Sequence, residues 1–347
     1  MQKQVSFLFI LVTGVLFTHC YKDENREPQT DPILFEVPSH FPEPVYNFEN
    51  NPLSLAGIEL GRKLFYDPAL SSDSSIACAS CHQQQHGFSD LGQPVSQGIN
   101  LAVGTRNSPS LSNLIWNTSF MWDGGINHIE IMPLAPIQQE KEMGSNLQLI
   151  ASRLNASLNY RSDFKTAFDA DSITSPDFFR ALTQFLSTMV SSQAKYDDFL
   201  NGLTELTNLE KEGYRIFQSN CSSCHKEPLT THFQFENNGT FYKFPADSGR
   251  NRITLEPADI GKFKVPSLRN VMVSAPYMHN GAFETIDDVL NHYSEDLEQA
   301  ESRSELLSEN MHFSSEDREA LKAFLQTLTD YEYLNDEKLS NPFLNND

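Results

Sequence analysis

The chain has 347 residues, enough for two modest domains that each bury a hydrophobic core. Its 46 acidic residues outnumber its 25 basic ones and give a formal net charge of −21. This balance argues against a nucleic-acid-binding protein, because phosphates need a basic surface. Solubility explains the charge better than attraction of a basic partner, which is the alternative.

Residues 1–20 are predicted to be an export signal. Lys3 provides a short basic start, and the apolar run from 5 to 17 has the length of a signal-peptide core and is too short to span a bilayer. Cys20 follows at once, where a bacterial lipoprotein carries its lipid; an ordinary cleaved signal with an incidental cysteine is the alternative. Both interpretations predict a protein of the periplasm or cell envelope. Lipidation would add a membrane anchor and leaves exposure at the cell surface open.

Residues 21–45 are polar and contain prolines, so we expect a flexible tether there. From 46 onward the spacing of apolar residues predicts mainly helices. The expected helices cover 53–65, 145–156, 175–201, 206–217, 284–293, 300–308 and 315–329. The intervening segments 83–137 and 226–270 are expected to be long functional loops, with a short β-hairpin near Gly239-Thr240.

Four of the five cysteines belong to two Cys-x-x-Cys-His motifs. The motifs are Cys78-Ala79-Ser80-Cys81-His82 and Cys221-Ser222-Ser223-Cys224-His225. Two thiols at this spacing can form thioethers to the two vinyl groups of one haem, and the adjacent histidine can then bind the iron. A zinc site that pairs the two motifs, or two disulfides, are the alternatives, but neither requires a histidine directly after each pair.

We therefore expect two covalently bound haem c groups. The predicted fold class is mostly α, with two cytochrome c-like haem domains and long wrapping loops. The domain boundary is expected near 203, so that residues 46–203 surround the first haem and residues 204–347 surround the second.

Further motifs occur in an order found in one bacterial family. They are Gly61-Arg62-Lys63-Leu64-Phe65-Tyr66-Asp67, Gly87-Phe88-Ser89-Asp90, Arg106-Asn107-Ser108-Pro109-Ser110-Leu111, Trp122-Asp123-Gly124, Glu142-Met143-Gly144, Asn237-Asn238-Gly239, Phe263 to Val271, and Ala275 to Gly281. On these motifs the chain resembles the bacterial di-haem cytochrome c peroxidase/MauG family. The resemblance implies that the haem held by His82 is the peroxidatic one and that the haem held by His225 takes in and stores electrons.

The resemblance also implies two catalytic residues. Trp122 corresponds to a tryptophan that relays electrons between the haems; without the family match it would be interpreted as a core aromatic residue. Glu142 corresponds to the catalytic glutamate, since a carboxylate over the iron can move a proton between the two oxygens of a peroxide. By residue type alone, Glu142 would be a solvated surface residue. The family often has glutamine where Met132 stands, so we expect a less polar pocket.

In many family members a loop histidine blocks the N-terminal iron until the other haem is reduced. No histidine occurs between Gly87 and Arg106, where that loop should lie, and His86 is only four residues from His82. We expect His86 to pack against its neighbours or to bind a haem propionate. The N-terminal iron is then expected to be open without reductive activation.

The sixth ligand of the second iron distinguishes the subfamilies. Cytochrome c peroxidases place methionine seventeen residues after the proline of the Pro276-Tyr277-Met278-His279 motif, whereas MauG-type enzymes have tyrosine; here the position is Tyr293. A phenolate is a harder ligand than a thioether and lowers the potential of the iron. The alternative is that Tyr293 only packs on an amphipathic helix while His292 or Met278 binds the iron.

A calcium ion between the haems is a further implication of the resemblance. Its protein ligands would be the Asn107 side chain and the carbonyl oxygens of Ser274 and Pro276, with water completing the shell. The family also suggests a homodimer.

Three functions are compatible with these features. The first is a peroxidase that reduces hydrogen peroxide to water with electrons from a small exported cytochrome or another donor. The second is a MauG-type oxidase of a protein or organic substrate, which Tyr293 favours. The third is a non-catalytic electron carrier, which needs no catalytic acid and no open iron; Glu142 and the missing loop histidine argue against it.

Overall fold

The computed structural model describes residues 34–240, 246–295, 297, 303–307 and 311–344. The predicted signal, its Cys20 and the first part of the predicted tether lie outside these residues. The described chain is mostly helical, which confirms the predicted fold class. Within these ranges, no helix combines the length and apolar character needed to cross a membrane.

The elements are short and joined by long loops. The α-helices are α1 Leu55–Tyr66, α2 Cys78–Cys81, α3 Leu134–Gln138, α4 Leu147–Ala156, α5 Leu158–Phe168, α6 Ser175–Ser187, α7 Lys195–Leu200, α8 Asn208–Asn220, α10 Asn251–Thr254, α11 Ile286–Glu295, α12 Ser315–Gln326 and α13 Tyr331–Asn335. The 3-10 turns are Phe48–Asn50, Pro68–Leu70, Gln84–His86, Ile99–Leu101, Leu114–Trp116, Pro257–Asp259, Val271–Val273, Glu305–Leu307 and Glu337–Leu339. Strands β1 Phe235–Glu236 and β2 Phe263–Lys264 pair antiparallel, with Phe235 opposite Lys264.

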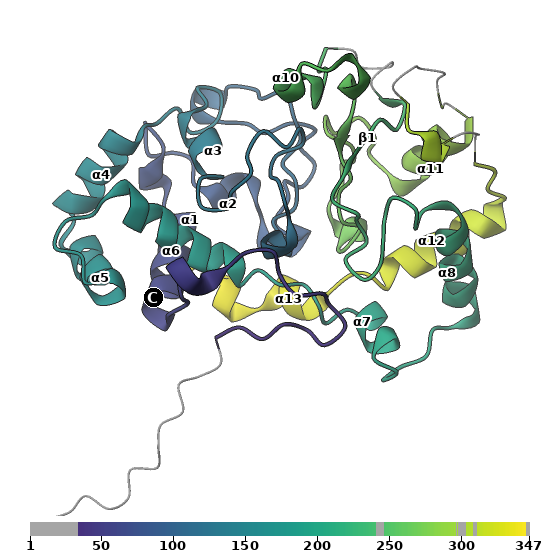
Figure 1. Cartoon of the computed structure of the whole chain (residues 1–347), viewed down its shortest axis with the longest axis horizontal. Helices are drawn as coiled ribbons and strands as arrows, with labels where there is room; N and C mark the ends of the chain where they lie inside the picture. The colour runs from purple at the N-terminus through teal and green to yellow at the C-terminus, as the bar shows by residue number, and fades with distance from the viewer. Residues whose placement is uncertain (1–33, 241–245, 296, 298–302, 308–310, 345–347) are drawn as a thin grey trace, which may run out of the picture. The chain divides into compact units, whose positions relative to one another are not determined.

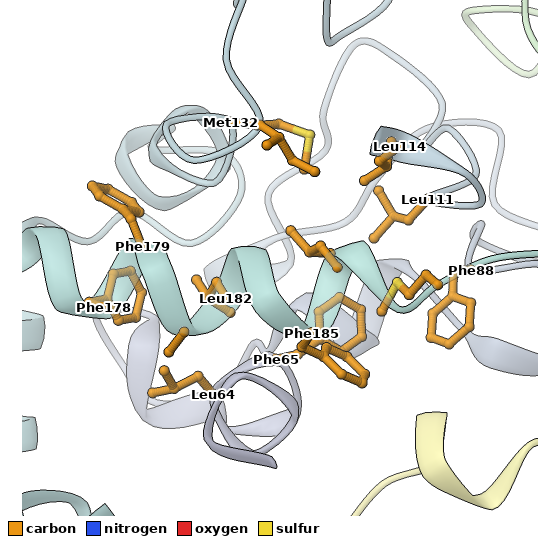
Figure 2. Packing of buried hydrophobic residues seen from close by; sticks show 14 of the residues in the cluster. Leu64, Phe65, Phe88, Leu111, Leu114, Met132, Phe178, Phe179, Leu182 and Phe185 are labelled. Carbon is orange, nitrogen blue, oxygen red and sulfur yellow. The ribbon is translucent and has the colours of Figure 1, made fainter. Parts of the chain in front are cut away.

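In the N-terminal part, α1 crosses α6 at Gly61, where there is no room for a side chain. A Cβ on Gly61 would lie 2.0 Å from the Ala181 carbonyl oxygen and 2.8 Å from the Phe185 Cβ. This close approach lets the Phe65 and Phe185 rings pack with their centroids 5.4 Å apart in the core (Figure 2). Aromatic packing beside a glycine contact therefore joins the two helices.

In the C-terminal part, α8 crosses α12 in the same way, and the two helices lie side by side in Figure 1. A Cβ on Gly213 would lie 1.9 Å from the Ala320 carbonyl oxygen and 2.8 Å from the Phe324 Cβ. The Phe217 and Phe324 ring centroids are 5.0 Å apart. Both α1 and α8 precede a Cys-x-x-Cys-His motif, and each carries a glycine followed four residues later by a phenylalanine. The same packing of one helix against another therefore occurs before each motif.

Residues 34–45, expected as part of the tether, are packed against the protein. Phe41 is 7% exposed, and its ring contacts Trp116 edge-on at 5.2 Å. The Trp116 indole N–H donates to the Pro42 carbonyl oxygen at 2.7 Å. The prolines and polar residues of this segment suggested a tether, but its aromatic residues have partners far along the chain.

The end of the chain returns to the N-terminal core. Tyr333, Leu334 and Leu339 belong to the same buried cluster as α1, and the Tyr66 hydroxyl donates to the Leu339 carbonyl oxygen at 2.7 Å. The domain boundary expected near 203 stays a prediction. The return of 331–339 to the N-terminal core was not expected, because local spacing does not say which core a short helix will join.

Three other predicted elements differ from the structure. The helix expected over 175–201 is two helices, α6 and α7, because the segment between them turns so that the Ser191 hydroxyl and the Gln193 N–H both donate to Asp330. The hairpin expected near Gly239-Thr240 is replaced by pairing of β1 with the distant β2. The helix expected over 300–308 lies partly outside the described residues, and its residues 305–307 form a 3-10 turn.

Candidate functional site

The first Cys-x-x-Cys-His motif forms a single helical turn. Cys78 and Cys81 bound α2, and the His82 N–H closes the turn on the Cys78 carbonyl oxygen at 3.0 Å. The His82 Nδ1 lies 2.9 Å from the Phe88 carbonyl oxygen, so this nitrogen is the protonated one and Nε2 keeps its lone pair. Burial lowers the pKa of His82 and keeps the ring neutral. This is the form that binds a metal.

The second motif follows the end of α8 with the same geometry. The His225 N–H bonds to the Cys221 carbonyl oxygen at 2.8 Å. Its Nδ1 lies 3.2 Å from the Thr230 carbonyl oxygen and 3.1 Å from that of Pro266. Burial lowers the pKa of His225 to about 4. Two backbone acceptors therefore fix the tautomer and leave Nε2 as the ligating atom.

The four thiols fit thioether attachment better than the two alternatives. In the described part of the chain none of them forms a disulfide. Burial raises the pKa of Cys78, Cys81 and Cys221 to about 12, so these thiols are protonated in the chain alone. No group of three histidine, cysteine or acidic residues is placed to hold a metal among the described residues. Neither alternative gives a role to the histidine that follows each thiol pair and keeps its Nε2 lone pair, so the residues present fit a covalently attached haem at each motif.

A cavity of about 300 Å³ lies at the second motif and extends to residues of the N-terminal core. Cys221, Cys224 and His225 line it at the second motif, and Leu111 and Met132 line it toward the first. Most of its lining is apolar, as a porphyrin requires. The sequence alone could not predict this continuity, because its walls come from loops far apart in the chain.

Trp122 lines the same cavity. Its indole N–H donates to the Asn107 carbonyl oxygen at 2.8 Å, and its own carbonyl oxygen accepts from the Lys264 N–H at 2.8 Å. One hydrogen bond therefore holds the ring and another holds the main chain beside it. This placement is compatible with the predicted relay role as well as with simple packing.

Glu142 lies in the turn between α3 and α4, half-buried. Burial raises the pKa of its carboxyl group. The Ile99 N–H donates to the Glu142 carbonyl oxygen at 2.8 Å, which ties the turn to the loop after the first motif. The thiol of Cys81 has its pKa raised by burial first and then by the nearby charges of Asp90 and Glu142. The Glu142 carboxyl group therefore lies close enough to the first motif for its charge to act on the Cys81 thiol.

The pocket near the first motif is apolar where the family often has an amide. Met132 is 9% exposed and lies across from Leu111 and Leu114 (Figure 2). His86 does not point into this pocket, since its Nδ1 lies 3.2 Å from the Val273 carbonyl oxygen. The structure thus gives His86 a packing role.

Near the second motif, two of the three candidate sixth ligands line the cavity. Tyr293 on α11 and Met278 are among its lining residues. His292 is fully buried, and its Nε2 lies 2.8 Å from the Asn238 carbonyl oxygen, which makes it the weakest candidate. Burial raises the pKa of Tyr293 to about 12. Iron coordination would have to offset that rise.

The three predicted calcium ligands lie along one wall. Asn107, Ser274 and Pro276 all line the cavity. The Asn107 amide donates to the carbonyl oxygens of Gln93 at 3.2 Å and Pro94 at 3.3 Å, so its Oδ1 is the atom available to a cation. A calcium ion held by these residues stays a prediction.

Sequence reasoning gave no role to two polar residues of the cavity. Lys264 lines it, donates from Nζ to the Ser119 carbonyl oxygen at 3.0 Å, and has its pKa lowered to about 8 by burial. Asn238 lines the cavity between Tyr293 and Met278. Both occur in the motifs quoted above, but only their contacts with distant segments indicate a role.

Comparison with known proteins agrees with this geometry. The profile of the family "Di-haem cytochrome c peroxidase" matches residues 55–205, and that of "Cytochrome c" matches residues 210–329. The methylamine utilization protein MauG of Methylorubrum extorquens is 33% identical over 83% of this chain and 82% of its own length. The cytochrome c551 peroxidase of Nitrosomonas europaea is 34% identical over 78% of this chain and 79% of its own length.

A solved structure shows the same arrangement. The crystal structure of a MauG-like protein associated with microbial copper homeostasis superposes with a TM-score of 0.81 at 30% identity. The match covers 89% of this chain and 99% of that one.

Proposed function

Because the chain belongs to the family of di-haem cytochrome c peroxidases and MauG proteins, we propose that it reduces hydrogen peroxide to water with electrons from an external donor. The electrons enter at the C-terminal haem and pass to the N-terminal haem. The chain is an oxidoreductase of this family and carries two c-type haems. One observation carries the proposal: the charge of Glu142 acts on the Cys81 thiol of the first motif, so the candidate acid lies near that motif. Trp122 and the candidate phenol ligand Tyr293 support it, because both line the cavity at the second motif.

When bound, a haem supplies the iron that takes up peroxide and exchanges electrons. The chain must supply protons, because one peroxide consumes two protons and two electrons to give two waters. Glu142 is the residue proposed for this, and its charge acts on the Cys81 thiol of the first motif. Burial raises its pKa, which brings the carboxyl group closer to the range in which it both takes up and releases a proton.

Apolar side chains around the same pocket exclude water. Met132, Leu111 and Leu114 replace the polar contacts that an amide would make. With its Nδ1 held by the Phe88 carbonyl oxygen, His82 would hold the iron of a bound haem through Nε2, while the His86 Nδ1 is bonded to the Val273 carbonyl oxygen. A haem held in this way would be able to take up peroxide without a prior reduction step.

Trp122 is the proposed route for electrons between the haems. The indole N–H fixes the ring to the Asn107 carbonyl oxygen, and the Trp122 main-chain carbonyl oxygen accepts from the Lys264 N–H. A large polarisable ring in an apolar wall shortens the distance that an electron must cross through saturated groups.

A MauG-type oxidase is the second candidate, and Tyr293 is the observation that favours it. Its phenol reaches the cavity beside the second motif, where it would favour oxidised iron. Such an enzyme would use peroxide to oxidise a protein or organic substrate. A non-catalytic electron carrier is the third candidate. It would give the half-buried Glu142 near the first motif no function.

A steady-state assay separates these candidates. Purified protein with both haems attached is mixed with hydrogen peroxide and a reduced small c-type cytochrome. A peroxidase oxidises two donor molecules per peroxide. Peroxide consumption without donor oxidation, accompanied by oxidation of an added organic substrate, would indicate the oxidase. If neither donor nor peroxide is consumed, the proposal is wrong.

The proposal includes five further features on sequence grounds alone. They are export, a lipid anchor at Cys20, placement in the periplasm or cell envelope, a calcium ion and a homodimer. The Cys20→Ser variant is expected to leave the membrane fraction. If wild-type protein is already soluble after cell fractionation, the anchor is absent.

A further inference from the structure

Asn238 stands between the two candidate ligands of the second haem. Its Nδ2 lies 3.3 Å from the Tyr293 hydroxyl oxygen and 3.3 Å from the Met278 sulfur. Its backbone carbonyl oxygen lies 2.8 Å from the His292 Nε2. One residue therefore contacts each side chain that the sequence proposed as the sixth ligand.

The orientation of the Asn238 amide is fixed by its other end. The Thr240 N–H donates to the Asn238 Oδ1 at 3.2 Å, and the Thr240 hydroxyl donates to the same oxygen. A backbone N–H can only donate, so the amide oxygen must face Thr240 and the NH₂ group must face Tyr293 and Met278. Both of these side chains are therefore acceptors.

Met278 is held at this amide by an unusual backbone. Its φ is 74°, in the left-handed region that favours glycine. The turn that imposes this conformation is closed by the Tyr277 N–H on the Phe283 carbonyl oxygen at 2.7 Å and by the Gly281 N–H on the Met278 carbonyl oxygen at 3.2 Å. A long side chain kept in such a conformation beside a ligand pocket indicates a functional constraint.

We propose that Asn238 is the positioning residue that selects the sixth ligand at the second haem, holding the Tyr293 oxygen ready for the iron and the Met278 thioether in reserve. Oxygen is a stronger hydrogen-bond acceptor than a thioether sulfur, so the shared amide stabilises the phenol in place more than the thioether. This inference rests on the proposed ligation by Tyr293. Without the Asn238 amide, Tyr293 and Met278 compete for the iron, and a larger fraction of the protein is ligated by the Met278 sulfur.

The experiment records the far-red absorption and the electron paramagnetic resonance spectra of purified di-haem protein and compares the variants with the wild type. The Asn238→Ala variant is expected to acquire the thioether-to-iron charge-transfer band, with the ratio of tyrosine-ligated to methionine-ligated protein falling about tenfold or more. Adding Met278→Leu should abolish the band. Met311 also lines the cavity, so Met311→Leu is the matched control and should leave the band in place.

The Asn238→Asp variant keeps an oxygen toward Thr240 and loses both donors, so it should behave like Asn238→Ala. Far-ultraviolet circular dichroism and haem content confirm that each variant folds. If Asn238→Ala and Asn238→Asp both keep the wild-type spectra, the selection role is overturned. If Tyr293→Phe also leaves the spectra unchanged, the proposal that Tyr293 binds the iron is wrong. If Tyr293→Phe changes the spectra and the two Asn238 variants do not, only the proposal for Asn238 is wrong.

Discussion

Glu142 acquires its proposed role from its surroundings, because a glutamate in an acidic chain is ordinarily a solvated residue. Here it is half-buried in a turn tied to the loop after the first cysteine pair. General acid–base catalysis contributes roughly 10²- to 10⁴-fold to a rate. We expect Glu142→Gln to keep both haems attached and to slow peroxide reaction by about that factor in stopped-flow measurements. The control is Glu140→Gln, which changes an exposed neighbour; near-normal turnover by Glu142→Gln would remove Glu142 from the mechanism.

The pH dependence gives a separate test of the same residue. Burial raises the pKa of Glu142 above the ordinary glutamate value of about 4.3. Since the carboxylate form takes the proton from peroxide, the rate should fall as pH drops through the raised pKa. The acidic limb of the pH–rate profile should therefore lie above pH 4.3 and disappear in Glu142→Gln. A limb that persists in the variant belongs to another group.

The roles of individual residues could be assigned from the sequence to different extents. The spacing of Cys78, Cys81 and His82 specifies a cofactor chemistry by itself. Glu142 and Tyr293 were found only by their positions in a family pattern. The role of Asn238 could not be found from the sequence, because it depends on contacts with Met278 and Tyr293 from two other segments.

The glycine contacts between helices give a prediction about the elements. A Cβ on Gly213 would lie 1.9 Å from a backbone carbonyl oxygen of α12, so α8 and α12 would have to separate. Overpacking of this kind costs about 1–3 kcal/mol. We expect Gly213→Ala to lower the thermal unfolding midpoint and to reduce haem attachment at Cys221 and Cys224. Gln218→Ala on the exposed side of α8 is the control; equal stability of the two variants would contradict the close crossing.

Helix prediction succeeded where the contacts are local. Helices α1, α8 and α12 have an apolar stripe along one face, and spacing identifies such stripes. The break between α6 and α7 could not be predicted from local spacing, because the segment between these helices is hydrogen-bonded to Asp330 near the far end of the chain. The pairing of β1 with β2 was missed for the same reason.

A buried ion pair ties distant parts of the whole chain together. Arg269 donates to both carboxylate oxygens of Asp197 at 2.8 and 2.6 Å, and both side chains are essentially unexposed. His40 from the N-terminal segment lies 2.7 Å from the same carboxylate. Removing one partner of a buried pair costs about 3–5 kcal/mol. Asp197→Asn should therefore lower the denaturant midpoint markedly at neutral pH.

The acid dependence of this effect has a definite sign. Burial alone would raise the pKa of Asp197, but Arg269 and the other hydrogen bonds lower it below the ordinary value of about 3.9. The stabilisation is therefore complete above pH 3.9 and is lost as pH falls through the lowered pKa. The difference in stability between wild type and Asp197→Asn should shrink below about pH 4. A difference that is constant down to pH 2 would show that the charge is not responsible.

The optical and electron paramagnetic spectra of the oxidised protein, recorded before and after addition of hydrogen peroxide, test the central claim most directly. One high-spin ferric haem with an open position and one six-coordinate haem are predicted, and the high-spin signal should disappear with one equivalent of peroxide. Two six-coordinate haems that do not respond to peroxide would contradict the account.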